Sequence, residues 1–282
     1  MRCRGFTLVE IVVALALTLV VTGSIHRLLV TTQRLSRRQA AQVDLQSSLR
    51  AGAHIVASEL RELSAVEGGS ADQTDVLSIS RSAITYRVAR GIGFVCQTPT
   101  AGQLRIARST FSGARDPEPS RDVIFLFVEG SPAAGTPDAW LPLAITSVTT
   151  SGRCPGMAGP AIGISINSPI PPTEVGTPLR IYETMELRLY QSNGEWWLGA
   201  RSISAAEAIQ PVIGPLAGGD GLQLEYLDRA GRATVDRSSI RSIIVTLRGT
   251  YNHSLGTSEA PLEQELVTQV TLRNGIERSQ PQ

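Results

Sequence analysis

The sequence predicts an α+β fold in which one long N-terminal helix packs on a β-rich C-terminal head. Two observations predict it: apolar residues recur with helical spacing through the first 66 residues, and polar and apolar residues alternate from Val76 onward. We therefore expect a membrane-spanning helical half over residues 6–27, an amphipathic half over 28–66 and a single head over 70–282, after a short basic segment of residues 1–5.

The composition bounds the possible classes of function. The chain has 282 residues, of which 42% are hydrophobic, and this is enough for one sizeable core or for a modest core with an extended anchor. Its 26 basic residues, all of them arginine, nearly balance 25 acidic residues. The chain therefore lacks the basic excess of a nucleic-acid-binding protein, and we expect no nucleic-acid partner.

The first 25 residues contain an apolar run that is long enough to cross a bilayer. Phe6–Ile25 would rise about 30 Å as a helix, and Arg2 and Arg4 precede it, which favours a cytoplasmic N-terminus and an exported head. A secretory signal cleaved after its apolar core fits poorly, because the run is too long and no small-residue site follows it. A lipoprotein signal fails because Cys3 precedes the run.

The run contains one carboxylate, Glu10, between Leu8-Val9 and Ile11-Val12. An ionised group inside a membrane costs about 2.5–3.5 kcal/mol on insertion scales, so its default interpretation is a functional site with a partner. The alternative is that Glu10 lies at the level of the lipid headgroups and has no role.

The segment Gly5-Phe6-Thr7-Leu8-Val9-Glu10 resembles the type IV prepilin signal, in which a short basic leader and a glycine precede an apolar helix. The resemblance implies that a prepilin peptidase cuts between Gly5 and Phe6 and methylates the Phe6 amine. It also implies that the helix is retained and packs into a fibre core. The expected partners are this peptidase, other pilin or pseudopilin subunits and an inner-membrane assembly platform.

Cleavage at this point would place the new amine of Phe6 about one helical turn from Glu10. Within one subunit, the two charges would satisfy each other only in part. In a fibre, the amine of one subunit pairs with Glu10 of its neighbour, so the cost of burying a lone charge favours assembly. This expectation makes Glu10 the assembly residue.

The helix continues beyond the membrane with a narrow apolar stripe. Residues recur at seven-residue intervals with one interruption at Gln42, and further apolar residues lie on the same side; the stripe comprises Leu28, Leu35, Leu45, Leu49, Ala53, Val56, Leu60 and Leu63. We expect this stripe to lie on a sheet and the helix to end near Gly68-Gly69.

The rest of the chain alternates with a period of two. Predicted strands cover residues 76–80, 83–90, 93–96, 103–108, 123–128, 179–191, 195–202, 222–227, 240–248 and 266–273. Asn193-Gly194 predicts a tight hairpin between two of them. Residues 112–121 and 151–177 are predicted to be irregular, because Gly and Pro are dense there.

Only Cys96 and Cys154 remain in the head once Cys3 is assigned to the leader. An even pair outside the cytoplasm makes a Cys96–Cys154 disulfide the leading interpretation, and two buried free thiols are the alternative. Such a bond would join a predicted strand to the irregular segment 151–177. It would stabilise the head by about 2–4 kcal/mol.

No cluster in the sequence indicates catalysis. Nucleophile, phosphate-loop, zinc and dinucleotide motifs are absent, and the three histidines have no partners at a catalytic spacing. A calcium site using Asp220 or Asp228 remains an alternative to plain turns. Of Trp196-Trp197, one ring is expected in the core and the other at the surface. We therefore expect no enzyme, no cofactor and no metal.

The C-terminal half resembles two related groups. LDRAGR, IRSIIVTL and LVTQVTLRN, at residues 227–232, 240–247 and 266–274, look like segments of PilW-type minor pilins and of J-type pseudopilins of type II secretion. The resemblance implies a minor pilin or pseudopilin that primes or caps a fibre. It would be stored in the inner membrane with its head in the periplasm. The alternative is a periplasm-facing binding module held by an uncleaved signal anchor.

Overall fold

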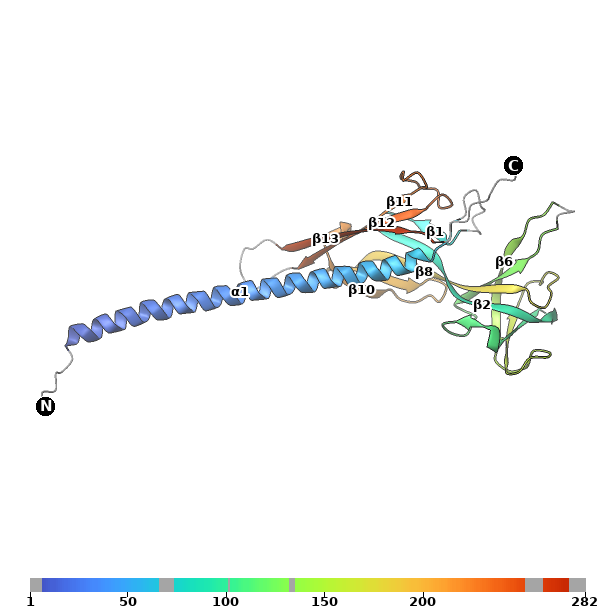
Figure 1. The fold of residues 1–282 in the computed structure, drawn as a ribbon, viewed down its shortest axis with the longest axis horizontal. Helices are drawn as coiled ribbons and strands as arrows, with labels where there is room; N and C mark the ends of the chain where they lie inside the picture. Colours follow the sequence, from blue (N-terminus) through green and yellow to red (C-terminus); the bar gives the residue numbers. More distant parts are fainter. Residues whose placement is uncertain (1–6, 66–73, 101, 132–134, 252–260, 274–282) are drawn as a thin grey trace.

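The computed structural model describes residues 7–65, 74–100, 102–131, 135–251 and 261–273. The expected leader 1–5, Phe6 and the expected helix end at Gly68-Gly69 lie outside these ranges. The described chain has one long helix lying against an antiparallel β-rich head, with the first turns of the helix far from the head (Figure 1). The predicted α+β pilin-like fold is confirmed.

Helix α1 spans Leu8–Arg61, 54 residues without a break, or about 80 Å at 1.5 Å per residue. Its first half is exposed on all sides, and burial begins at Ala41. The stripe residues from Leu45 to Leu60 face the head as predicted, but Leu28 and Leu35 remain 70% and 55% exposed. They lie too near the N-terminus to reach the head.

The helix ends earlier than the sequence indicated. The amphipathic half was expected to reach residue 66, whereas α1 ends at Arg61. The carbonyl of Arg61 accepts a hydrogen bond from the N–H of Arg273 at 2.9 Å. The Ser64 carbonyl accepts one from the Asp75 N–H at 2.8 Å, and the Ser64 N–H donates to the Asp75 carboxylate at 2.9 Å. These tertiary partners replace the next helical turn. The local sequence gives no sign of them.

The described strands join into one antiparallel sheet. Their bounds are β1 Val76–Ile79, β2 Ala83–Thr100, β3 Gln103–Ala107, β4 Ser112–Gly113, β5 Asp122–Val128, β6 Ala139–Thr149, β7 Ala161–Ile166, β8 Pro178–Ser192, β9 Glu195–Ser202, β10 Gln210–Leu216, β11 Leu222–Leu227, β12 Ser242–Tyr251 and β13 Leu262–Thr271. Asn193 and Gly194, both with positive φ, form the predicted tight turn between β8 and β9.

Three long strands were missed, and one prediction of irregular structure was wrong. β7 lies inside the segment 151–177 that was predicted to be irregular. Five of its six residues are buried, so the polar–apolar alternation that marks a half-buried strand is absent. β6 and β10 contain prolines, which weaken the strand pattern. The two predicted strands 83–90 and 93–96 are one strand, β2.

The first of two hydrophobic cores lies between α1 and the sheet. Leu49, Val56 and Leu60 from the helix pack against buried residues of β12 such as Val245 and Leu247. The helix approaches the sheet closely because two glycines leave room. A Cβ on Gly52 would lie 2.9 Å from Ile213 Cγ1, and one on Gly249 would lie 2.6 Å from Leu45 Cδ1.

The second core fills a closed barrel at the end of the head far from the N-terminus (Figure 1). The strands pair in the ring β2–β3–β7–β6–β5–β8, and the ring closes because β8 also pairs with β2. All six strands contribute to its interior, which contains Val95, Leu104, Ile106, Ile124, Leu126, Leu143, Ile145, Ile162, Ile164, Ile166, Leu179 and Ile181. β2 and β8 are long enough to run through both cores and so join them.

We predict that Gly249→Val destabilises the docking of the helix on the sheet. The added branched side chain would collide with Leu45 and Leu49, so the free energy of unfolding should fall by about 1–3 kcal/mol. Urea denaturation of the detergent-solubilised full chain measures this. Gly219→Val is the matched control, because the nearest side-chain atom to a Cβ there, on Trp196, is 3.9 Å away. Equal losses in both variants would contradict the close approach.

Candidate functional site

The helix begins with a cap that uses the predicted assembly residue. Thr7 Oγ1 accepts a hydrogen bond from the Glu10 N–H at 3.4 Å, and Glu10 Oε2 accepts one from the Thr7 N–H at 3.1 Å. The Thr7 hydroxyl also donates to Glu10 Oε2 at 3.0 Å. This reciprocal arrangement is a capping box, and it gives the carboxylate of the single subunit local partners. Gly5 and Phe6 lie outside the described residues, so their processing stays a prediction.

The first half of α1 has no partner in the described head. Within the residues described, it is the one segment that is long and apolar enough to cross a membrane, and its most apolar stretch is not buried against the rest of the protein. Eleven large apolar side chains are exposed there: Leu8, Val9, Ile11, Val12, Val13, Leu15, Leu17, Leu19, Val20, Val21 and Ile25. A soluble single-domain protein rarely exposes such a continuous apolar surface.

A buried ionic cluster that the sequence did not indicate lies where the two cores meet. Glu183 of β8 is directly opposite Asp122 of β5, and both side chains are almost fully buried. Two like charges in register repel each other, so they require compensation. Arg90, Arg115 and Arg121 supply it.

Glu183 accepts hydrogen bonds from Arg90 Nε and Arg121 Nε, each at 2.6 Å. Arg115 binds both oxygens of Asp122, at 2.6 and 2.8 Å, and also reaches Glu183 at 3.3 Å. These bonds tie β2, β5, β8 and the segment before β5 together. Sequence reasoning missed the cluster because its members are separated by up to 93 residues. Because its buried carboxylates are bound by arginines from separate segments of the chain, the cluster acts as a structural clamp.

The environment shifts two carboxyl pKa values in opposite directions. Burial raises the pKa of Glu183, but hydrogen bonds from Ser202, Arg121 and Arg90 outweigh it and lower the pKa to about 2. At Asp75, burial dominates and raises the pKa to about 6, although the N–H of Ser64 and the charge of Arg87 oppose it. Asp75 holds the chain that leaves the helix beside the start of β1.

Cys96 and Cys154 are joined by a disulfide, with a Cα–Cα distance of 5.7 Å. The bond links β2 to the segment between β6 and β7, and it is buried beside Ala107 and Ala161. It therefore fastens the outer end of the barrel.

The remaining polar candidates have structural roles. The Asp228 carboxylate accepts hydrogen bonds from the N–H groups of Ala230 and Arg232 at 2.8 and 2.9 Å, which closes the turn after β11. Asp220 pairs with Arg248. Among the described residues, no group of three His, Cys, Asp or Glu side chains could hold a metal ion.

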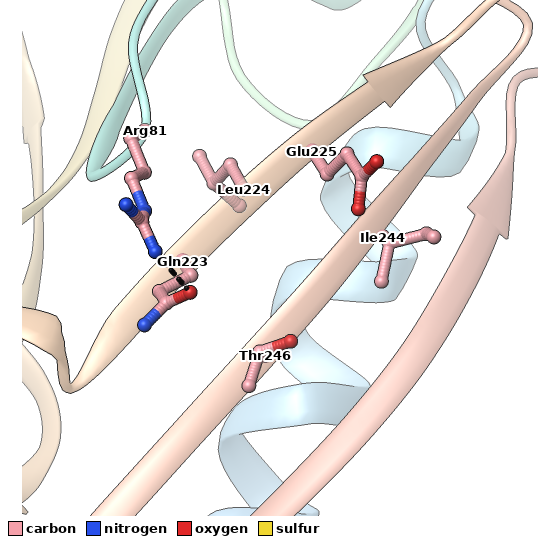
Figure 2. Close-up of a pocket in the computed structure, with 6 residues that line it drawn as sticks. All are labelled: Arg81, Gln223, Leu224, Glu225, Ile244 and Thr246. Carbon is pink, nitrogen blue, oxygen red and sulfur yellow. Dashed lines mark hydrogen bonds between the residues drawn. The ribbon is translucent and has the colours of Figure 1, made fainter. Parts of the chain in front are cut away.

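Several hollows on the described surface are lined by residues of the helix or the sheet. The hollow in Figure 2 has a volume of about 320 Å³ and lies on the outer face of β11 and β12. Two of the side chains that line it are hydrogen-bonded to each other, since Arg81 donates to Gln223 Oε1 at 2.9 Å. Trp196 packs against the core under the helix, and Trp197 lines another hollow; both rings are half-buried, so neither is fully core or fully exposed. No arrangement of a nucleophile with a base is present in these places.

The first 25 residues match the prokaryotic N-terminal methylation motif. No curated protein and no solved structure matches the chain. The match ends within the apolar half of α1, so it describes the signal and the start of the anchor and not the head.

The chain therefore carries a type IV prepilin-like signal on a pilin-like α+β fold, and the signal together with the apolar helix indicates a type IV pilin-like, single-pass membrane-anchored protein. The motif indicates a structural subunit. It implies processing by a prepilin peptidase and contact with other pilin subunits.

We predict that Glu183→Gln lowers the free energy of unfolding at pH 7 by about 2 kcal/mol, because three arginines lose a shared anion. A lowered folded-state pKa contributes stability that is present above the ordinary value of 4.5 and is lost as the pH falls toward 2. The difference between wild type and variant should therefore vanish between these two pH values. Asp75 contributes a pH dependence of the opposite sign, because its raised pKa adds stability at low pH that is lost as the pH rises through about 6. Asp75 is present in both proteins, so its contribution cancels when the unfolding free energy of the variant is subtracted from that of the wild type.

Glu186→Gln is the matched control for this measurement. Glu186 has one arginine partner, Arg201, at 2.6 Å, so its loss should cost about 1 kcal/mol or less. Chemical denaturation at a series of pH values measures both variants. A pH-independent difference for Glu183→Gln would contradict the ionic clamp.

We predict that Cys96→Ser with Cys154→Ser lowers the free energy of unfolding by about 2–4 kcal/mol, because the bond closes a loop with a sequence separation of 58. Urea denaturation of the full chain, with and without reductant, measures the loss. Reductant should have no effect on the double variant. Alkylation of both cysteines in unreduced protein from membranes would contradict the bond.

Proposed function

We propose that this protein is a minor pilin or pseudopilin that primes or caps a type IV pilus or a type II secretion pseudopilus. Prepilin peptidase cuts between Gly5 and Phe6, and the Phe6 amine is methylated. The subunit waits in the inner membrane, anchored by residues 6–27, until an assembly platform transfers it into the fibre.

One observation carries this proposal: the signal at residues 1–25 leads without a break into a helix whose apolar first half has no partner in the head. A bilayer covers that surface during storage, and the helices of neighbouring subunits cover it in a fibre. The second half of the same helix is fixed to the head by Leu49, Val56 and Leu60. Movement of the anchor therefore carries the head with it.

The orientation in this proposal rests on the signal and not on the distribution of charge. Two arginines precede the apolar run, at positions 2 and 4, whereas four follow it: Arg27, Arg34, Arg37 and Arg38. Arg2 and Arg4 favour an exported head, but the four arginines beyond the run favour a cytoplasmic one and outnumber them, so the charge count does not support the exported head. A leader that is removed by a peptidase on the cytoplasmic side fixes the opposite orientation, with the head in the periplasm. The Cys96–Cys154 disulfide supports that compartment.

The capping box at the start of α1 refines the role of Glu10. In the single subunit, the carboxylate is bound to Thr7 of its own chain. We infer that assembly exchanges these neutral donors for the charged Phe6 amine of the adjacent subunit. Both kinds of donor bind an ionised carboxylate, but the amine adds the attraction of a full positive charge, and this attraction is stronger in a nonpolar fibre core than in water. The exchange would therefore favour the fibre over the stored subunit.

The place of the subunit in the fibre follows from its C-terminal half. Residues 227–232, 240–247 and 266–274 resemble PilW-type minor pilins and J-type pseudopilins, and 282 residues is long for a major pilin. Whether the fibre is a type IV pilus or a type II secretion pseudopilus, this role makes the protein a scarce tip or priming subunit. Deletion of the gene should abolish either piliation or protein secretion, and the process that is lost identifies the fibre.

We predict that the mature protein purified from membranes begins at Phe6 with one added methyl group. N-terminal mass analysis measures this directly. An intact Met1 start would contradict the proposal and would favour a binding module held by an uncleaved anchor. Gly5→Leu should block cleavage and leave the protein in the membrane.

We predict that Glu10→Gln and Thr7→Ala have different effects on fibre entry, because one removes the charge that pairs with the adjacent subunit and the other removes the capping box within the subunit. Thr7→Ala removes the hydroxyl of the capping box and leaves the Glu10 charge, so the subunit should still enter fibres. Glu10→Gln keeps a hydrogen-bond acceptor but loses the charge, so the variant should insert in the membrane and fail to enter fibres. Immunoblots of sheared fibres and of membranes measure both. Equal behaviour of the two variants would assign Glu10 to the cap alone.

A further inference from the structure

The C-terminal strand β13 is a long open edge of the sheet. Ten consecutive residues of β13, Leu262–Thr271, pair with β12 without a register shift. In the part of the chain that the structure describes, β13 has no strand on its other side. β13 contains no proline and no bulge, which are devices that proteins use to protect an edge.

Two hydrogen bonds define which backbone groups point outward from this edge. The N–H of Leu272 donates to the Arg241 carbonyl, beside β12, at 2.9 Å, whereas the N–H of Arg273 donates to the Arg61 carbonyl of the helix. Successive backbone groups of a strand alternate in direction. The odd-numbered residues 263–271 therefore present their N–H and C=O groups to the open edge. Their side chains are exposed on the outer face of the sheet.

The helix packs on one face of β13 and reaches the line of its edge at Arg273, just beyond the strand. Val270 and Leu272 are buried in the core under α1, and Leu262 and Leu266 pack against the same core. The odd-numbered side chains lie on the opposite, outer face. Figure 2 shows turns of helix behind this part of the sheet, with side chains of the neighbouring strands β11 and β12 drawn as sticks.

The charge beside this edge is unbalanced. Arg248 of β12 is 3.4 Å from Glu265 and 3.7 Å from Glu263, and it also pairs with Asp220. One guanidinium thus contacts three half-exposed carboxylates, which leaves an excess of two negative charges. A strand that adds to the edge is favoured if it brings an arginine or lysine to this position.

The anchor excludes antiparallel pairing between two copies of β13. Gly249, which is opposite Gln264, lies over Leu45 near the start of the helix contact, and Arg273 lies at Arg61. β13 therefore runs in the same direction as α1, which Figure 1 shows alongside it. Two antiparallel copies of β13 would carry anchors that point in opposite directions, and these cannot share one membrane or one fibre.

A second copy also offers no other comparable edge at the ends of its path of described strands. β1, at one end, has only four residues, and β11, at the other end, has its outer side occupied, because the N–H of Leu224 donates to the Arg81 carbonyl at 2.7 Å. Parallel pairing of two β13 edges would bring the acidic residues Glu263 and Glu265 of both copies together, so the occupant is an extended segment of a different chain. Main-chain hydrogen bonds to an exposed edge are a common mode of recognition.

We propose that the open edge of β13 receives an extended strand from a different pilin or pseudopilin subunit, with a basic side chain placed opposite Glu263 and Glu265. This inference rests on the proposed function, since it names the kind of partner that the fibre subunit recognises. It assigns the C-terminal strand as the surface that selects the neighbour.

Proline substitution tests the edge without unfolding the sheet. Val267→Pro removes an outward N–H and leaves the β12–β13 hydrogen bonds intact, so thermal stability should stay close to that of wild type. Recovery of this variant in sheared fibres should fall about tenfold or more. Thr268→Pro is the matched control, because it removes an inward N–H and should lower thermal stability. Glu265→Lys should weaken incorporation through charge without touching the backbone.

Hydrogen exchange provides a second measurement on the wild-type full chain. In the detergent-solubilised subunit, the amides of Val267 and Gln269 should exchange freely, whereas those of Leu266 and Thr268 should be protected. In isolated fibres, Val267 and Gln269 should become protected by about tenfold or more. Normal incorporation of Val267→Pro, or unprotected odd-numbered amides in fibres that contain the subunit, would overturn the inference and leave the proposed function intact. Failure of the wild type to enter any fibre would instead reject the proposed function.

Discussion

The unburied apolar half of α1 is the constraint on which the rest of the structure depends. Eleven large apolar side chains between Leu8 and Ile25 have no contact with the head, and burying each contributes about 1.5–3 kcal/mol. That surface requires a bilayer or other helices at all times. The head is attached only to the second half of the helix, so the chain separates an exchangeable anchor from a permanently folded domain.

The membrane anchor and the head hold their carboxylates in different ways. At the start of the helix, Glu10 is held by neutral groups of Thr7, and such partners are readily exchanged. In the head, Glu183 and Asp122 are held by several arginines in a buried cluster, where replacing partners is costly. The first arrangement suits a subunit that must change its surroundings. The second fixes the relation between the helix-bound sheet and the barrel.

The sequence predicted the features that depend on local periodicity. The long helix, the Asn193-Gly194 turn and most half-buried strands follow from spacing alone, and the signal was recognised from six residues. Features that depend on distant partners were missed. β7 is buried on both faces and shows no alternation, and the helix end at Arg61 is set by Arg273 from the other end of the chain. No local pattern marks the Glu183 cluster, because its residues come from separate strands.

The closed barrel has a consequence for a subunit that is stored before use. Anchored proteins diffuse in two dimensions and meet one another often, and exposed strand edges are the usual starting points of aggregation. A ring of six strands has no such edges, so the barrel offers identical neighbours no strand to extend. The long edge that stays open among the described strands, β13, cannot pair antiparallel with its own copies in one membrane, so crowding leaves few routes to edge-to-edge aggregation.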